Sequence, residues 1–246
     1  DVVKSSAEEL DALLGGGLEA GTACMLVGAT GTGKTSVATL YAYAAAKRGQ
    51  RAAIFSFDER PETFFKRSEG LGMDLRPLVE DGLIILRTVN TAELSPGECA
   101  QNLRDAVEQD DVKLVMIDSL TGYFHAMPQE EALLAQLHDL LAFLSERGVL
   151  TLLVVGQHGM LAEAVKAPLE VSYLADTVIV IRHFEATGSV RKAISVLKKR
   201  HGPHETTIRE LQLAPGSISV GAPIEDFTGV LSGRPHFLGR ASELPE

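Results

Sequence analysis

Short apolar runs alternate with segments of helical periodicity between residues 22 and 156. A strand inside a parallel sheet reads as a near-continuous apolar run, whereas a crossover helix shows apolar residues every three to four positions. The runs that predict strands are 22–28, 51–57, 83–89, 113–118 and 149–156. The segments that predict helices are 34–49, 61–72, 95–109 and 130–148. This alternation favours an α/β fold with a mostly parallel central sheet and crossover helices.

The pattern changes toward the C-terminus. Residues 176–184, 191–199 and 205–213 read as successive strands, separated by the turn signals ATGS and HGP. Strands joined by short turns run antiparallel, so we expect these strands to extend the sheet in that manner. In particular, 191–199 and 205–213 are expected to form a hairpin whose exposed turn is KKRHGPH. No repeat or low-complexity segment interrupts the chain.

Length and composition limit the possible functions. A chain of 246 residues fits one large α/β domain, and we expect a single domain over 1–246. The start at Asp1, without a methionine, is compatible with a domain cut from a longer, tandem-domain protein. The net charge of −10 argues against a general grip on nucleic acid. The lone cysteines Cys24 and Cys99 lack metal-ligand spacing, and Cys24 lies in an apolar run, which favours a buried thiol and a reducing cytoplasm. No signal peptide and no apolar run of membrane-spanning length is found.

The sequence GATGTGKT at 28–35 matches the phosphate-binding pattern G-x-x-x-x-G-K-[ST]. It follows a strand and opens a helix, where backbone N–H groups and the helix N-terminus can face phosphate oxygens. Lys34 is expected to reach the β- and γ-phosphates of ATP, and Thr35 to bind Mg²⁺. The residues expected to cradle the nucleotide are Gly28, Thr30, Gly31, Thr32, Gly33, Lys34, Thr35 and Ser36.

Carboxylates follow two of the other strands. Asp118 ends the strand 113–118 and is the expected second protein residue on the Mg²⁺ side. Asp58 and Glu59 follow the strand 51–57, and strand ends gather at one edge of a parallel sheet. Either carboxylate could orient and deprotonate the attacking water, although Asp58 could instead cap the helix that begins at Pro61.

Gln157 follows the strand 149–156. It could contact the γ-phosphate, or it could simply satisfy the polar groups at a strand end.

Taken together, these residues resemble the RecA-type ATPases, and more closely the KaiC-like domains of circadian-clock proteins. The resemblance covers nearly the whole chain, through GGGLEAGT, FSFDE with LGMDL, VMIDSLT, ADTVIVI and VLKKRHGPHETTIREL, and more weakly GVLSGRP. It implies a RecA-like P-loop NTPase core and a ring, usually a hexamer, with ATP between subunits. In this family two adjacent glutamates act as catalytic carboxylates at the positions of Asp58 and Glu59. Because the first is an aspartate here, Glu59 is the preferred catalytic base.

The resemblance also gives the basic segment near residue 200 a role. It implies that Lys198, Arg200 and His204 face the γ-phosphate of a neighbouring subunit, where an arginine would stabilise the transferring phosphoryl group. A solvated basic turn is the simpler alternative. A zinc site built on His201 and His204 lacks further ligands nearby in sequence.

The expected function is a cytoplasmic, Mg²⁺-dependent ATPase that signals through its conformation to an unidentified protein. A further hypothesis is autophosphorylation at Ser172, because Ser172-Tyr173 replaces a Ser-Thr pair of KaiC. One alternative is a recombinase or motor that binds single-stranded DNA, but the segment 157–173 carries one lysine against two glutamates. Another alternative is a scaffold locked by ATP, with negligible turnover.

Overall fold

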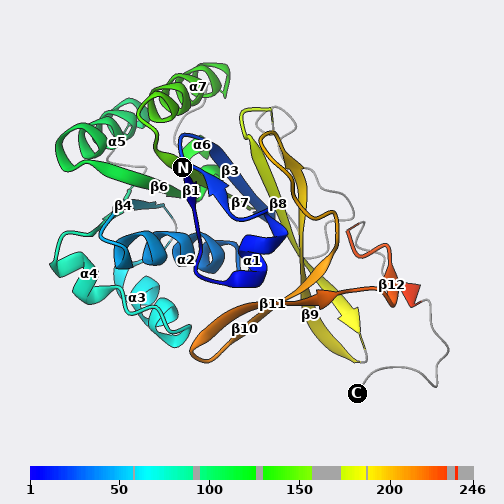
Figure 1. Cartoon of the computed structure of the whole chain (residues 1–246). Coiled ribbons are helices and arrows are strands. Elements are labelled where there is room, and N and C mark those ends of the chain that lie inside the picture. Colours follow the sequence, from blue (N-terminus) through cyan, green and yellow to red (C-terminus); the bar gives the residue numbers. More distant parts are fainter. Residues whose placement is uncertain are drawn as a thin grey trace.

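A nine-stranded sheet forms the centre of the computed structural model, which describes residues 1–57, 59–90, 95–125, 130–156, 173–186, 188–231 and 236–237 (Figure 1). The strand order is β11-β10-β9-β8-β3-β7-β6-β4-β5. The parallel strands are β5 (Ile84–Thr88), β4 (Arg51–Ser56), β6 (Val112–Asp118), β7 (Leu150–Gly156), β3 (Ala23–Gly28) and β8 (Thr177–Ala186). The antiparallel extension consists of β9 (Ser189–Lys199), β10 (Arg209–Ala214) and β11 (Ser217–Pro223). The expected fold class is therefore confirmed.

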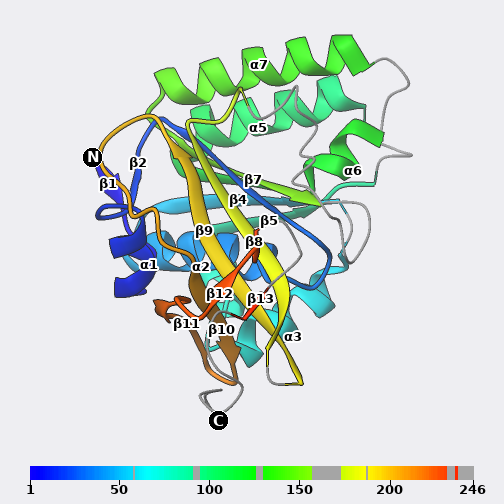
Figure 2. The ribbon, with the colours of Figure 1, turned by 90° about the vertical axis from the view of Figure 1, so that its right-hand side faces the viewer.

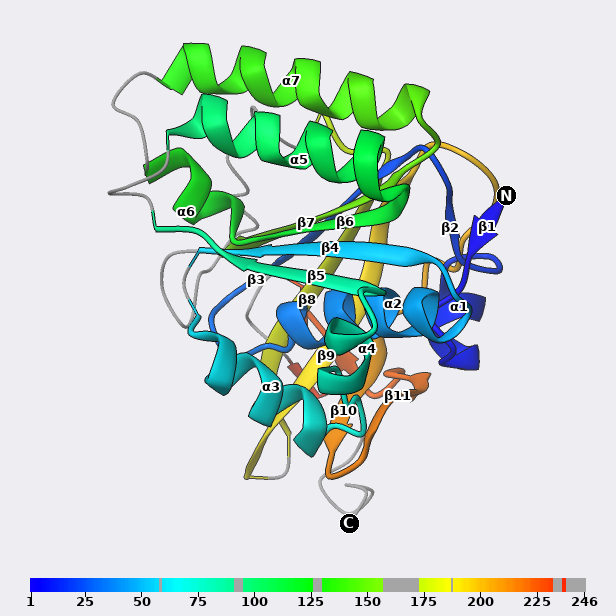
Figure 3. The same ribbon diagram turned by 90° about the vertical axis from the view of Figure 1, so that its left-hand side faces the viewer.

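Helices cover both faces of the sheet (Figure 3). One face packs against α1 (Glu8–Leu13), α2 (Lys34–Lys47), α3 (Pro61–Gly70) and α4 (Arg76–Glu80). The other face packs against α5 (Pro96–Asp110), α6 (Leu120–His125) and α7 (Glu130–Glu146). Every residue of β3 is buried, as the apolar run predicts, because both faces of this strand are covered. Among the described helices, none combines the length and apolar character needed to cross a membrane.

Several short elements have no clear signal in the sequence. Near the N-terminus, β1 (Val2–Val3) pairs with β2 (Leu18–Glu19), on either side of α1. Near the C-terminus, β12 (Phe227–Thr228) pairs with β13 (His236–Phe237). This second pair lies against β8 and β9, where Phe227 packs edge-on to Phe184 (Figure 2). Such two-residue strands are too short to show a period, and their neighbours in space are distant in sequence.

Strands β9 and β10 pair antiparallel as expected, but the tight turn expected between 191–199 and 205–213 is wrong. β10 begins only at Arg209, which pairs with Ile194 in the middle of β9. Residues 200–208 therefore form a longer connection rather than a tight turn. The connection folds back on the N-terminal segment, where the N–H of Glu205 donates to the carbonyl of Leu13 at 3.0 Å. These tertiary contacts prevail over the local turn signal.

Candidate active site

The carboxyl ends of four strands meet at one edge of the sheet. Gly28 at the end of β3 pairs with Gly156 at the end of β7, and Asp118 at the end of β6 pairs with Val154 of β7. Ser56 at the end of β4 pairs with Asp118. The glycine-rich loop, Asp118 and the chain after β4 are thus brought to the same edge, as the sequence predicts.

The glycines of the loop are required by its geometry. A Cβ on Gly28 would lie 2.2 Å from the carbonyl oxygen of Ile181 in the neighbouring β8, so no side chain fits. Gly31 and Gly33 have φ of +80° and +103°, a region that L residues rarely adopt. Gly33 directly precedes α2, so the free N–H groups of the first helical turn face the loop. Backbone of this shape is able to bind an anion.

Lys34 is buried at the base of the loop. Its Nζ donates a 2.7 Å hydrogen bond to the carbonyl of Ala29, which also accepts from Oγ1 of Thr32 at 2.9 Å. Burial lowers the pKa of the Lys34 ammonium, and the charge of Asp118 opposes that shift. This interaction agrees with the strand pairing, which brings the loop and Asp118 to the same edge of the sheet.

The remaining loop residues differ in their exposure to solvent. Thr30 and Gly31 are exposed at the loop apex, whereas Thr32 and Ser36 are buried. Thr35 lies in the first turn of α2 and is partly exposed. Its hydroxyl and the Asp118 carboxylate are the hard oxygen ligands that suit Mg²⁺, which usually takes one or two protein groups and completes its shell with water and phosphate oxygens.

Glu59 is held at the same edge by α3. Its Oε2 accepts a hydrogen bond from Nη2 of Arg67 at 2.7 Å. Its backbone carbonyl accepts from Oγ of Ser56, at the end of β4, at 3.3 Å. The neighbouring carboxylate, Asp58, lies outside the described residues.

His183 is a residue of this site that the sequence analysis missed. Its Nε2 would lie 3.8 Å from a Cβ on Gly31, beside the loop apex. Its Nδ1 is buried and has no hydrogen-bond partner within the described part of the chain. The available signal is the alternation of β8, because Ile179 and Ile181 face α2 and His183 continues that face.

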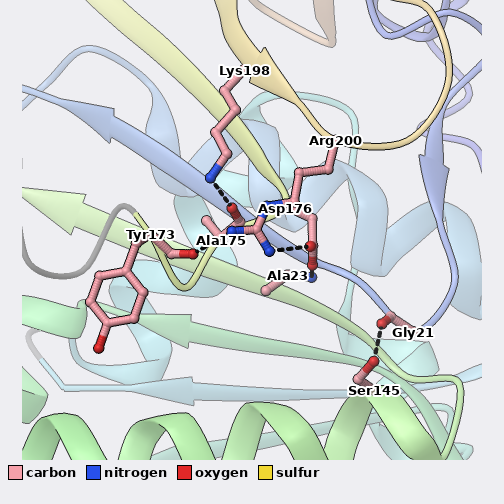
Figure 4. A network of polar contacts seen from close by, with 8 residues as sticks. All are labelled: Gly21, Ala23, Ser145, Tyr173, Ala175, Asp176, Lys198 and Arg200. Carbon is pink, nitrogen blue, oxygen red and sulfur yellow. Dashed lines mark hydrogen bonds and ion pairs between the residues drawn. The ribbon is translucent and has the colours of Figure 1, made fainter.

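Lys198 and Arg200 lie beside the amino end of β3, and Figure 4 shows their polar contacts. Thr177 pairs with both Cys24 and Lys199, which puts Arg200 beside the start of β3 rather than beside its phosphate loop. Nearby residues already bind both side chains. Nζ of Lys198 donates to the carbonyl of Ala175 at 2.7 Å. Lys198 is half-buried and the side chain of Arg200 is 49% exposed, so these contacts hold the basic segment without burying it.

The guanidinium of Arg200 has two partners. Its Nη2 donates to the carbonyl of Tyr173 at 2.8 Å, and its Nη1 lies 3.4 Å from Oδ1 of Asp176. Burial lowers the pKa of nearby Lys198, and the positive charge of Arg200 lowers it further. The two cations are thus close neighbours, and the Asp176 carboxylate offsets part of their charge.

Asp176 connects Arg200 to β3, a role that the sequence did not reveal. Its Oδ2 accepts from the N–H of Ala23 at 3.0 Å, and its own N–H donates to the carbonyl of Ala23 at 2.8 Å. Its backbone carbonyl accepts from the N–H of Arg200 at 2.9 Å. The only signal in the sequence is an acid placed directly before a buried strand.

A cavity of about 360 Å³ adjoins this network. It is lined by Tyr173, Asp176 and Arg200, and from α7 by His138 and Ser145. His204 is half-buried in the connection that follows Arg200. Gln157 and Ser172 lie outside the described residues.

Comparison with known proteins identifies the family. The sequence model of the KaiC ATPase matches residues 3–225. The chain is 26% identical over 241 residues to "Circadian clock protein KaiC3" of Synechocystis sp., covering 97% of this chain and 47% of that protein. It is 23% identical over 233 residues to "Circadian clock oscillator protein KaiC" of Acaryochloris marina, covering 95% of this chain and 44% of that protein. The chain thus spans about half the length of the curated relatives it matches. With its phosphate loop, its strand-end carboxylates and a family match over most of its length, the chain belongs to the KaiC family of ATPases.

Proposed function

We propose that this domain hydrolyses ATP with Mg²⁺, in a ring where each nucleotide lies between two subunits. The observation that carries the proposal is the position of Arg200 relative to its own phosphate loop. They lie at opposite ends of β3, from Ala23 to Gly28, which at roughly 3.3 Å per residue are about 17 Å apart. This span exceeds the length of an arginine side chain, so an Arg200 that contacts a γ-phosphate would contact the one bound by a neighbouring subunit.

The chemistry follows from the groups at the two edges. The loop N–H groups and Lys34 hold the β- and γ-phosphates, and Thr35 and Asp118 would hold Mg²⁺, which neutralises phosphate charge when bound. Glu59 accepts a proton from water as the water oxygen bonds to the γ-phosphorus. The bond from that phosphorus to the β–γ bridging oxygen breaks, releasing ADP and phosphate. Arg200 of the neighbour stabilises the charge on the transferring group, assisted by Lys198 and His204.

Light scattering with and without Mg-ATP, combined with phosphate release, tests the proposal. We expect Mg-ATP to raise the mass from monomer toward a hexamer, and phosphate to be released. Lys34→Ala subunits on their own should neither assemble nor release phosphate, because the variant lacks the charge that neutralises the phosphates. An unchanged monomer mass at saturating Mg-ATP would contradict the ring. A ring without measurable turnover would instead indicate a scaffold, and salt-sensitive binding of single-stranded DNA would favour a motor.

The output proposed for this ATPase is conformational signalling to a protein partner in the cytoplasm. The relatives are named as circadian clock proteins, and the net charge of −10 disfavours nucleic acid as the partner. A γ-phosphate that is present or released would change the contacts of Arg200 across a subunit boundary. Such a change would alter the shape of any surface that two adjacent subunits form together.

Autophosphorylation at Ser172 is a second proposed activity, and one contact favours it. Ser172 directly precedes Tyr173, whose carbonyl accepts a hydrogen bond from Arg200. If Arg200 faces a neighbour's γ-phosphate, then Tyr173, the residue after Ser172, is hydrogen-bonded to the side chain that faces the transferred phosphoryl group. A serine hydroxyl there could replace water as the nucleophile, with Glu59 of the neighbour accepting its proton.

A further inference from the structure

Lys199 differs from the two basic residues beside it, because its side chain is only 2% exposed. Its ammonium donates to the carbonyl of Leu14 at 2.6 Å and to the carbonyl of Gly17 at 3.2 Å. It also lies 3.0 Å from Oε1 of Glu19. An ammonium has three N–H donors, so each has an oxygen partner. A buried charge satisfied in this manner fixes the backbone that carries it.

The acceptors belong to a single turn that leads from α1 into β2. Leu14 follows α1, and Glu19 is the last residue of β2, shortly before β3 begins at Ala23. Lys199 therefore joins two segments that are about 180 residues apart in sequence. One leads into the strand of the phosphate loop, and the other carries the residues proposed to act in trans.

The same two segments touch along their backbones. A Cβ on Gly15 would lie 2.1 Å from the carbonyl oxygen of Pro203, so only glycine allows this approach. The N–H of Glu205 donates to the carbonyl of Leu13 at 3.0 Å. The connection after β9 is thus held at Lys199, at Pro203 and at Glu205, and Arg200 lies between the first two of these points.

We propose that Lys199 is a positioning residue for the trans-acting arginine. By binding the turn at 14–19, it fixes the backbone from which Arg200 extends toward the nucleotide of a neighbouring subunit. Successive residues of a strand point to opposite faces, so an inward Lys199 directs Lys198 and Arg200 away from the turn. This inference rests on the proposed function, because it assumes that Arg200 acts on a neighbour.

The first test compares two lysine-to-methionine variants in Mg-ATP hydrolysis. Lys199→Met keeps the aliphatic stem but leaves the Glu19 carboxylate and two carbonyls without their donor. We expect kcat to fall at least about tenfold, since small misplacements of a catalytic group are costly. Lys113→Met is the matched control, because Lys113 also pairs with a carboxylate, at 2.6 Å from Asp111, but is exposed and belongs to β6, which does not neighbour β9. Lys113→Met should keep the parent kcat, and Lys199→Arg should recover part of the loss.

Mixed rings separate positioning from a general loss of structure. The benchmark is a mixture of Lys34→Ala and Arg200→Ala subunits, each inactive alone, which should regain activity where an intact phosphate loop meets an intact arginine. Lys199→Met mixed with Lys34→Ala should regain activity likewise, because its own phosphate loop is sound. Lys199→Met mixed with Arg200→Ala should stay inactive, since both subunits lack a working arginine.

Each other result overturns the inference. Parent-like kcat for Lys199→Met would show that the contact is dispensable. Recovery only with Arg200→Ala would assign Lys199 to the phosphate loop of its own subunit. Absence of recovery with either partner would indicate general damage. If the benchmark mixture fails in rings shown to contain both kinds of subunit, while the parent hydrolyses ATP, the trans-acting arginine is wrong and the inference falls with it, which identifies the failure as one of the proposed function.

Discussion

Arg67 binds the candidate catalytic base, Glu59, through a hydrogen-bonded ion pair with Nη2 and Oε2 2.7 Å apart. The Arg67 guanidinium also stacks over the ring of Phe64, 4.8 Å from its centroid and one turn earlier in α3. The helix thereby fixes the direction of the carboxylate. Because Arg67 occupies Oε2, Oε1 is the oxygen expected to accept the proton of the attacking water.

Replacing Glu59 should slow the chemical step more than it weakens binding. A base acts mainly in the transition state, so we expect Glu59→Gln to lower kcat about a hundredfold while the Kd for ATP changes little. Glu62→Gln is the matched control, because Glu62 is also 2.7 Å from an arginine, Arg76, but is highly exposed. It should hydrolyse ATP like the parent. Equal kcat for Glu59→Gln and the parent would remove Glu59 from the mechanism.

The affinity for ATP should fall at high pH because of Lys34. Only the ammonium form binds phosphate well, and burial lowers the pKa of Lys34 in the free protein from its usual 10.5. Loss of the proton, and of affinity, should therefore begin below pH 10.5. Titration of Kd between about pH 8 and 10 would measure this, with circular dichroism to follow the fold. Lys34→Arg remains charged over this range, so its Kd should stay flat, and an equal pH dependence would assign the effect to another group.

A methyl group at Gly28 should be destabilising. The Cβ would lie 2.2 Å from the Ile181 carbonyl and 2.9 Å from Oγ1 of Thr32, so the loop or β8 must move. We expect Gly28→Ala to lower the free energy of unfolding by roughly 3 kcal/mol. Gly156→Ala is the control, because Gly156 pairs with Gly28 but its Cβ would lie 3.7 Å from Oγ1 of Thr121, an ordinary contact. Similar denaturation midpoints for the two variants would refute this account of the loop.

Autophosphorylation can be tested by intact mass after incubation with Mg-ATP. We expect a mass gain of one phosphate that is absent in Ser172→Ala. Ser145→Ala serves as control, since Ser145 donates to the carbonyl of Gly21 at 2.6 Å and lines the cavity beside Arg200. An unmodified mass during sustained ATP hydrolysis would leave a plain ATPase.

The sequence predicts the parts of the fold that depend on local pattern. The apolar runs of β3, β4, β6 and β7 and the glycine-rich loop can be read directly, because burial on both faces and a tight turn each demand particular residues. The edge where Lys34 and Asp118 meet then follows from the rule for parallel sheets.

The connection after β9 could not be predicted in the same manner. A run of basic residues normally indicates a solvated surface. The Lys199 side chain is buried instead, and its ammonium binds oxygen atoms of residues 14–19. The start of β10 at Arg209 is likewise set by contacts with the N-terminal turn rather than by a local signal. The positions of His183 and Asp176 could not be predicted either, since they depend on β8 lying beside β3.

The central strand gives the molecule the means to couple successive sites. Through Asp176, the first residue of β3 is bound to Arg200, and the last residue of the strand begins the phosphate loop. In the proposed ring, the loop of each subunit and its outward arginine belong to one rigid unit. The nucleotide state of one interface would then be coupled to that of the next, and this coupling acts in both directions around the ring. ATP binding by the ring would then be cooperative, with a Hill coefficient that differs from one.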